Sequence, residues 1–531
     1  MAEAKSATAP RRLAVGERFA WNDLAPIARL LPEPVREHAS LLFAELEHLE
    51  IGPSFRDFRP AAAYVEAGRE MQKAVRLVEG GELEGFVAGA PFRWREGDSR
   101  DDPEAGLRLA WNALLAWEGD GAGGRFRIVH EDEGAPIADP VEGTWKKVWL
   151  SHRTEPGLRA ANAGMLFPGE KRRFAYVIEV EDRRRGYFRT VHYRYLPGAF
   201  GVLQPARASD TWAYLPTLRR AVRWRSPLLS KPILDFEVVL EDLPDFPLHL
   251  GVHRFRCVGS AVLIAPFSAT PARGSDPSAP VLRFEARRTV ALEARPRVKE
   301  APYATRTFHL DLETMRVLYR VDRDTRGRAT RVAAHAYLWS GDDPQAAGWP
   351  GVAEPRTLLP LRSVVVHVET GARKRTDFLD VRADPLPSRA AIRRRIALLP
   401  GCVAAGTPIA TPGGPRAVED LAPGDLVLAF DLARQSAVAA PIAAVSSRPA
   451  TRTLAFEGGL RVTPDHPLFA SGRWVEAGEV GPEDWLLRPD GGRVRAGRPQ
   501  TLVEPVAVYD LTVDGPSNFF AGGRLVHNKS R

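Results

Sequence analysis

The chain has 531 residues, 44% of them apolar and 26% charged, with a net charge of +8. This length exceeds one ordinary hydrophobic core and the composition is globular, so two or three domains are expected. Two cysteines exclude a disulfide framework, and the lack of any run near about 18 apolar residues excludes a transmembrane helix.

The sequence gives little sign of a cofactor, a metal or a nucleic-acid partner. No cysteine spacing typical of a metal site occurs, so we expect neither metal nor cofactor. Arginines are spread in short groups such as "EDRRRGYFR" and "PTLRRAVRWRSP", which favours a solvated basic surface over one that binds nucleic acid or an anionic membrane. The start, "MAEAKSATAPRRLAVGERFA", has no apolar run of secretory length, so no signal peptide is expected and the chain as written is cytoplasmic.

The first elements after a polar start are predicted to be helices. From about Trp21 to Gly68 the text is typical of helix, since "PEPVREHASLLFAELEHLE" repeats apolar residues at three-to-four spacing. The stretch "RPAAAYVEAGREMQKAVRLVEGG" predicts a further helix that ends at Gly80 and Gly81.

Strands dominate from there to about residue 385. "RRFAYVIEVEDRRRGYFRTVHYRYLP" alternates on both sides of a charged turn and predicts a hairpin. "HRFRCVGSAVLIAPF", "VLRFEARRTVALEARP" and "ATRTFHLDLETMRVLYRVDRDTRGRATRVAAHAYLWS" repeat the pattern. We therefore predict an α+β domain with a large curved antiparallel sheet and a few helices. "DPLPSRAAIRRRIALLPG" predicts a linker and a short helix.

The residue pattern of the sequence changes at Gly401. Short strands and Pro-Gly turns such as "TPGGPR" and "APGD" run to the end, which predicts a compact all-β unit over 402–528. Three stretches of this unit carry chemistry-bearing residues in a fixed order: "CVAAGTPIATPGGPRAVEDLAPGDLVLAFD", "LRVTPDHPLFA" and "VYDLTVDGPSNFFAGGRLVHN".

These stretches resemble the opening, middle and closing blocks of the Hint module found in inteins, bacterial intein-like proteins and hedgehog autoprocessing domains. The resemblance covers the whole unit and implies an all-β Hint domain that performs a single-turnover self-cleavage. It carries over to Cys402, to Thr463 and His466 of "TPDH", and to Asp510. The terminal pair, His527 and Asn528, completes it.

The chemistry explains why these residue types are needed. Cys402 can attack the carbonyl of Gly401 and turn the amide into a thioester, and His466 is the natural proton donor to the departing amine. Thr463 can hydrogen-bond the strained peptide or the developing oxyanion.

At the other end, the side-chain amide of Asn528 can close a succinimide with help from His527. The resemblance implies that Asp510 lies near both scissile bonds.

Two departures favour cleavage over splicing. Lys529 follows Asn528, where splicing needs Cys, Ser or Thr. Ser517 replaces the histidine usual before "NFF", which is expected to slow cyclisation, and only "KSR" follows as a second flank. Alternatives stay open: Cys402 can be a small buried hydrophobe in a folded but inactive Hint domain, and the thioester can be resolved by water or by an external nucleophile.

The earlier region contains the stretches "WAYLPTLRRAVRWRSP", "EGFVAGAPF" and "RFEARRTVALEA". These stretches resemble, more loosely, a bacterial family of envelope proteins (DUF1329) related to the outer-membrane lipoprotein-sorting fold. The resemblance implies a half-barrel around an apolar cavity that holds a lipid or acyl chain, and a location in the cell envelope or periplasm. The candidate ligand-binding residues are Trp212, Tyr214, Arg219, Arg220 and Arg223, which are equally compatible with sheet core and a solvated strand face.

We predict a precursor with an N-terminal segment (1–39), a lipid-carrier-like domain (40–385), a linker (386–401), a Hint domain (402–528) and a tail (529–531). Cleavage at Gly401–Cys402, and after Asn528, is expected to release the first domain. The alternatives are an envelope lipid-binding protein with an inert Hint domain, and an exported effector whose cargo the Hint domain releases.

Overall fold

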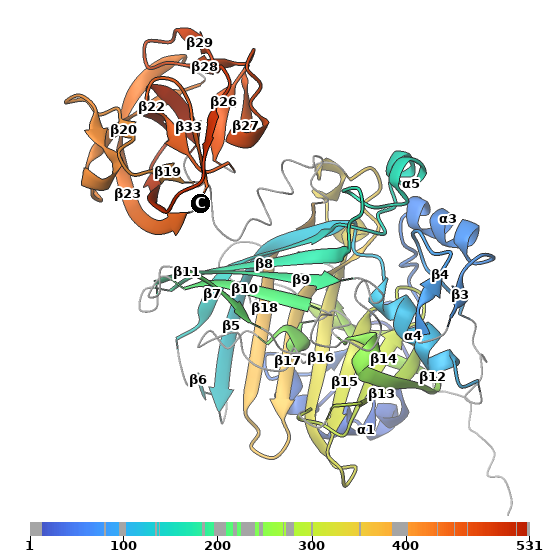
Figure 1. The fold of residues 1–531 in the computed structure, drawn as a ribbon. Coiled ribbons are helices and arrows are strands. Elements are labelled where there is room, and N and C mark those ends of the chain that lie inside the picture. The colour runs from blue at the N-terminus through green and yellow to red at the C-terminus, as the bar shows by residue number, and fades with distance from the viewer. Residues whose placement is uncertain are drawn as a thin grey trace, which may run out of the picture. The chain divides into compact units, whose positions relative to one another are not determined.

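The computed structural model describes residues 13–78, 81–94, 102–132, 135–136, 139–182, 186–195, 209–215, 220–224, 239–243, 248–268, 270–271, 281–298, 301–349, 352–384, 402–432, 434–450, 452–464, 466–516 and 518–527 (Figure 1). The chain divides into two compact units, residues 1–211 with 224–387 and residues 388–531 with 212–223. Each is described by itself. None of the described helices has both the length and the apolar character that a membrane crossing requires.

Short elements begin the first unit. They are β1 (Arg18–Phe19), the 3-10 helix η1 (Ala25–Leu30), α1 (Glu33–Glu37), α2 (Ala39–Leu42), β2 (Leu49–Glu50), α3 (Ala62–Met71), β3 (Arg76–Leu77), β4 (Leu83–Glu84) and α4 (Ala105–Leu114). The helical stretch predicted over 21–68 is thus broken into pieces, because prolines start η1 and α1 and stand in the segments between them. The helix expected to reach Gly80 ends at Met71, and the chain turns into β3.

A large sheet forms the body of this unit, and its path includes β10 and β11, whose residues 212–223 group with the second unit. Its strands are β5 (Gly121–Asp132), β6 (Ala135–Pro136), β7 (Val141–Trp149), β8 (Arg172–Asp182), β9 (Gly186–Tyr195), β10 (Ser209–Leu215), β11 (Arg220–Trp224), β12 (His253–Ser268), β13 (Leu282–Pro296), β14 (Thr305–Asp311), β15 (Val317–Arg323), β16 (Ala329–Trp339), β17 (Leu358–His367) and β18 (Arg373–Ala383). Between them lie α5 (Pro156–Asn162) and the 3-10 turns η6 (Leu240–Asp242), η7 (Leu250–Val252), η8 (Ser340–Asp342) and η9 (Ala346–Gly348).

The strand order is β11-β10-β9-β8-β7-β5-β18-β17-β16-β12-β13-β14-β15, with β6 on β5. The predicted half-barrel sheet is confirmed, and Figure 1 shows it bending so that β8 and β9 turn away from β16–β18. The hairpin predicted around "EDRRRG" is confirmed as β8–β9. In addition, β15 pairs with β16, and β16 pairs in parallel with the end of β12, so strands β12–β16 close on themselves.

Both faces of the sheet are covered by apolar packing. One core joins the first helices to β12–β17 and includes Trp21, stacked on Phe43 with ring centroids 5.4 Å apart. The other joins α4 to β12–β15. A Cβ on Gly106 of α4 would lie 2.5 Å from the backbone of Phe255, so only glycine permits this close approach of helix and strand.

The second unit is all-β, as predicted. Its strands are β19 (Val403–Ala404), β20 (Pro408–Ile409), β21 (Arg416–Ala417), β22 (Leu426–Asp431), β23 (Ser436–Ala450), β24 (Thr453–Ala455), β25 (Arg461–Val462), β26 (Pro467–Ala470), β27 (Arg473–Glu476), β28 (Trp485–Leu487), β29 (Arg493–Arg495), β30 (Gln500–Leu502), β31 (Val506–Val513), β32 (Asn518–Ala521) and β33 (Arg524–His527). The helical turns of its described part are η10 (Val418–Asp420) and η11 (Ala477–Glu479).

These strands form two sheets around one apolar core. One sheet has the order β22-β23-β31-β19-β25-β24-β30, and the other β21-β20-β32-β33-β26-β28-β29 with β27 on β26. Figure 1 shows the very short β19 inside the unit. Its two neighbours, β25 and β31, come from distant parts of the sequence, and this brings the candidate residues together.

Candidate functional site

The strand β19 gathers three of the residues singled out from the sequence. Its first residue, Val403, pairs with Val462 of β25 and with Tyr509 of β31, both antiparallel. The residue before Val403 is therefore opposite the residue after each partner. This register sets Cys402 between Thr463 on one side and Asp510 on the other.

Two hydrogen bonds lock Cys402 to Thr463. The backbone N–H of Cys402 donates to the Thr463 hydroxyl oxygen at 2.8 Å, and the N–H of Thr463 donates to the Cys402 carbonyl at 2.9 Å. The nitrogen of Cys402 is the amide nitrogen of the peptide bond to Gly401, which itself lies outside the described residues. The Thr463 side chain thus contacts the bond that the sequence marks for cleavage.

The thiol of Cys402 is buried. The residue is 2% exposed and packs with Ala404 and Val508 in a small apolar cluster. Water therefore has little access to the sulfur. A reaction within the chain needs no such access, whereas an attack from solvent does.

His466 follows Thr463 through a tight turn. Its N–H donates to the Thr463 carbonyl at 3.0 Å, and its carbonyl accepts from the N–H of Ala477 at 2.9 Å. The side chain is 2% exposed. Both ends of the TPDH segment are thus fixed by backbone bonds, and His466 is held inside the domain, three residues from Thr463.

Asp510 and His527 lie in different sheets. Asp510 is half-buried on β31, where its backbone pairs with Ser446 of β23. His527 is the last residue of β33 and pairs with Asn518 of β32. Its imidazole ring stands at 82° to the indole of Trp474, with centroids 4.6 Å apart. Asn528, Lys529 and Ser517 lie outside the described residues, so their predicted roles stay predictions.

Sequence reasoning missed Asn518. This residue is 1% exposed, and its side-chain amide accepts from the N–H of Phe430 at 2.7 Å and donates to the carbonyl of Phe430 at 3.0 Å. A third bond runs to the carbonyl of Pro516 at 3.1 Å. One side chain therefore ties β22 of the first sheet to β32 of the second. The signal that the sequence offers is an asparagine directly before two phenylalanines, Phe519 and Phe520.

The five candidate ligand residues on β10, on β11 and between them all fall in residues 212–223, which group with the second unit, and the structure describes them only in part. Trp212 lies half-buried on β10. The backbone places Tyr214 on the same strand and Arg220 and Arg223 on β11, while their side chains and the whole of Arg219 lie outside the described residues. Their predicted role as a ligand rim stays a prediction.

A buried group of charges on the large sheet was also missed. Arg306, Arg320, Arg331 and Lys374 stand on β14, β15, β16 and β18, and we call them the basic face. The turn η6 meets it through Glu241, which bonds Arg306 at 2.7 Å, and Asp242, which contacts Arg320 at 3.0 Å and also pairs with Lys374. Burial opposes ionisation of Asp242, but the attraction of Lys374 and Arg320 outweighs it and holds the pKa of Asp242 well below its usual range.

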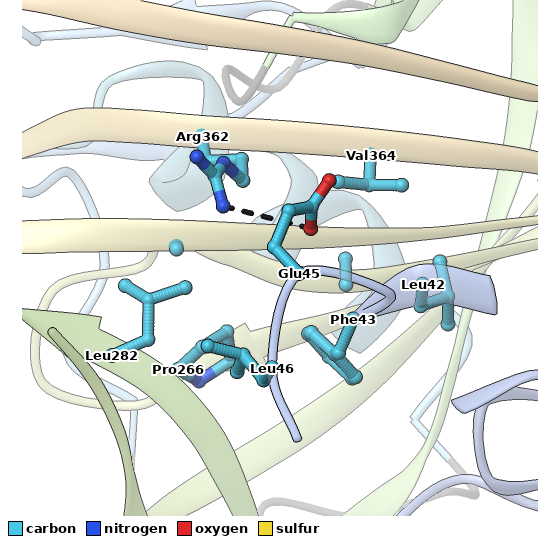
Figure 2. Close-up of a pocket in the computed structure, with 10 residues that line it drawn as sticks. Leu42, Phe43, Glu45, Leu46, Pro266, Leu282, Arg362 and Val364 are labelled. Atoms are coloured by element: carbon cyan, nitrogen blue, oxygen red, sulfur yellow. Dashed lines mark ion pairs between the residues drawn. The ribbon is translucent and has the colours of Figure 1, made fainter. Parts of the chain in front are cut away.

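The cavity in Figure 2 lies on the other face of this sheet. Its apolar lining includes Leu42, Phe43 and Val364, and the side chains of Glu45 and Arg362 reach toward one another there, 3.6 Å apart (Figure 2). The volume is about 10 Å³, about enough for one water molecule and far below that of an acyl chain. This cavity therefore gives no support to the predicted lipid site.

Several solved structures are similar to parts of this chain. A solution structure of a bacterial intein-like domain from Clostridium thermocellum matches with 28% identity over 24% of this chain and 99% of that one, with a TM-score of 0.23. A DUF1329 family protein from Desulfovibrio piger matches with 13% identity over 56% of this chain and all of that one, with a TM-score of 0.37. An outer-membrane lipoprotein-sorting protein domain from Vibrio parahaemolyticus matches with 15% identity over 56% and 99%, with a TM-score of 0.36. The latter two cover the N-terminal region. No curated protein sequence matches the chain.

One family model matches the sequence itself. It is the Pretoxin HINT domain, over residues 409–530. This range contains Thr463, His466, Asp510 and His527, and it begins shortly after Cys402 on the strand that follows β19. The C-terminal unit of this chain is therefore a Hint domain, with the capacity for autoprocessing that this domain type implies.

Proposed function

We propose that the Hint domain cuts its own chain at the Gly401–Cys402 bond through an N-to-S acyl shift. The observation that carries this proposal is the 2.8 Å hydrogen bond from the Cys402 N–H to the Thr463 hydroxyl. This bond places the hydroxyl of Thr463, the first residue of the TPDH segment, in contact with the nitrogen that becomes the leaving group. An amide is resonance-stabilised, so contact with that nitrogen is where a catalytic domain has to act.

The step balances within the chain. The Cys402 sulfur bonds to the Gly401 carbonyl carbon, and the carbon–nitrogen bond breaks. The thiol proton is lost, and the Cys402 nitrogen gains one, with His466 as the donor. Attack by the sulfur ends the conjugation of the nitrogen with the carbonyl. In the tetrahedral intermediate the N–H stays directed at the Thr463 oxygen, and the nitrogen lone pair, now localised, can accept the incoming proton.

The burial of Cys402 affects the two steps, the acyl shift and the release of the first unit, differently. The acyl shift is internal and proceeds with Cys402 only 2% exposed. Release of the first unit needs a nucleophile to reach the thioester carbonyl, and this is the slower step. We therefore expect hydrolysis to be slow and a small external thiol or amine to accelerate release.

The second proposed reaction is at the other end of the domain. The side-chain nitrogen of Asn528 attacks its own backbone carbonyl, a succinimide closes, and the bond to Lys529 breaks with the proton supplied by His527. Lys529 has no hydroxyl or thiol to accept an acyl group from the first site. Cleavage without ligation is the expected outcome.

Intact mass spectrometry of the freshly expressed full chain, with and without dithiothreitol, tests both reactions. We expect a fragment ending at Gly401 that increases with dithiothreitol and is absent in Cys402→Ala. Loss of the residues after Asn528 should disappear in Asn528→Ala. A single uncut mass under all conditions would refute the proposal.

A single uncut mass would support the alternative function, a lipid- or hydrophobe-binding protein with an inert Hint domain. A titration of Cys402→Ala with a fluorescent fatty acid, observed through tryptophan fluorescence, addresses the binding role separately. Saturable binding that Trp212→Ala weakens would support a ligand site near β10.

A further inference from the structure

The ring of His527 lies against a residue that the proposed mechanism does not use. Trp474 stands on β27, and its indole meets the imidazole at 82° with centroids 4.6 Å apart. Perpendicular ring pairs at this separation attract one another, because the edge of one ring meets the face of the other. The contact therefore restricts the orientation of the imidazole.

The strand β26 holds both partners in place. Its Phe469 pairs with Trp474 of β27, and its Leu468 pairs with Val526 of β33, the residue before His527. The contact between Trp474 and His527 thus runs across β26. It does not depend on a loop.

Trp474 itself has little freedom to turn. Its indole packs against Phe469 at 66° with centroids 5.1 Å apart, and both rings adjoin a cluster formed by Phe430, Leu487, Phe520 and Leu525. The side chain is half-buried. The indole that packs against His527, the final residue of β33, is therefore itself held in place.

Orientation matters for a proton donor. A histidine can act only when the correct ring nitrogen is within hydrogen-bond reach of the departing group, and a free imidazole divides its time among several rotamers. The Trp474 indole on one side of the imidazole excludes rotamers of His527 in which the ring nitrogen cannot reach the departing group.

We propose that Trp474 is a positioning residue that orients His527 for the C-terminal cleavage. The inference rests on the proposed Asn528 reaction and assigns to it a residue outside the motif. In this scheme Trp474 acts through the imidazole of His527.

The test compares Trp474→Leu, Trp474→Phe and the matched control Trp485→Leu in the full chain. Trp485 is a tryptophan of the same sheet, 42% exposed, with the Arg495 guanidinium 5.0 Å above its ring. Mass spectrometry follows two rates in each sample: loss of the residues after Asn528, and dithiothreitol-induced cleavage at Gly401. The second rate is the internal control for folding.

We expect Trp474→Leu to slow the Asn528 reaction about tenfold, the factor to which a ring pair of ordinary strength corresponds. Cleavage at Gly401 should keep its rate, Trp474→Phe should recover most of the loss, and Trp485→Leu should leave both rates unchanged. Equal loss of both rates in Trp474→Leu would show a general defect and overturn the inference, and so would an unchanged Asn528 rate.

A spectroscopic readout separates this inference from the proposed function. In the uncleaved double variant Cys402→Ala/Asn528→Ala, the indole shifts the NMR signals of the His527 ring protons, and Trp474→Leu should remove this shift and broaden the rotamer distribution. Absence of C-terminal cleavage in the wild type would refute the Asn528 step. The His527 signals would still decide whether Trp474 orients the ring, and signals unchanged in Trp474→Leu would overturn that role.

Discussion

Replacement of Asn518 by alanine is the sharpest test of how the Hint domain is held together. The change removes three hydrogen bonds: two to the backbone of Phe430, at 2.7 and 3.0 Å, and one to Pro516, at 3.1 Å. Phe430 is 1% exposed, so its N–H and carbonyl lose their partners where little water can replace them. Each unsatisfied buried group costs about 1–3 kcal/mol.

The expected loss of unfolding free energy is therefore about 2–5 kcal/mol. For a domain of roughly this size, each kcal/mol lowers the melting temperature by about 3–5 °C, so the Hint transition should move down by at least about 6 °C. The assay is differential scanning calorimetry of the double variant Cys402→Ala/Asn528→Ala, in which neither proposed cleavage can occur, with and without Asn518→Ala. Urea unfolding followed by tryptophan fluorescence supplies the free energy.

Two comparisons sharpen the result. Asn518→Asp keeps an acceptor for the Phe430 N–H but turns a negative oxygen toward two carbonyls, so it should destabilise at least as much as alanine at neutral pH. Asn162→Ala in the first unit loses one bond, from its amide to the Met165 carbonyl at 2.6 Å, and should leave the Hint transition in place. A loss below about 1 kcal/mol in Asn518→Ala would refute the view that this side chain joins the two sheets.

Three other outcomes are expected. Thr463→Val keeps the shape of the side chain but removes the acceptor at 2.8 Å from the Cys402 N–H. It should slow thiol-induced cleavage about tenfold or more in a mass-spectrometric time course. An unchanged rate would show that Thr463 takes no part in the mechanism. Burial raises the pKa of Glu45, but Arg373 and the other arginine partners of Glu45 outweigh this and lower the pKa to about 2. The ionised carboxylate therefore contributes about 3 kcal/mol of stability above pH ~4.5, and this contribution is lost as the pH falls toward 2. Urea unfolding between pH 7 and 3 should show this dependence of the unfolding free energy on pH, and a smaller dependence in Glu45→Gln. Asp242→Asn leaves Lys374 facing an uncharged partner in the interior and should cost about 3–5 kcal/mol, seen as a lower transition of the first unit alone.

The sequence predicted what depends on local pattern. Alternation of apolar and polar residues identified β8, β9, β12 and β13. A strand with one buried and one exposed face shows this alternation within its own residues, so no knowledge of its partner strands is needed. The short helical pieces before residue 50 were read as longer helices, because the apolar spacing continues through prolines that interrupt the backbone.

What the sequence could not give is long-range register. That Cys402 stands opposite Thr463 follows from the pairing of Val403 with Val462, and neither residue has a distinctive side chain. The site residues themselves came from a resemblance in motif order. The distances between them came only from the fold.

Buried polar groups were the other omission. Glu241 and Asp242 stand in a charged stretch that is typical of solvent-exposed loops, yet both are at most 6% exposed. Nothing in the local pattern distinguishes a carboxylate that meets water from one that meets Arg306 and Lys374, because the partners lie more than sixty residues away in the chain.

The hydrogen bond between the Cys402 nitrogen and Thr463 has a consequence for the state after cleavage. An amide nitrogen is neutral, but the amine that replaces it carries a positive charge at physiological pH below its pKa of about 8. Protonation of that amine puts a cation on a residue that is 2% exposed, beside the neutral hydroxyl of Thr463 and opposite the half-buried Asp510 of β31.

A charge left in such a place is costly unless it finds a counter-ion or water. The cut domain should therefore be less stable than the intact precursor around β19, and its new amino terminus should swing outward or toward the carboxylate. Such a movement takes the amine away from the acyl group while that group is still on the Cys402 sulfur, and so opposes re-formation of the amide. Once a nucleophile has removed the acyl group, the bond to Gly401 cannot re-form, so burial at the end of a two-residue strand favours a one-way cut.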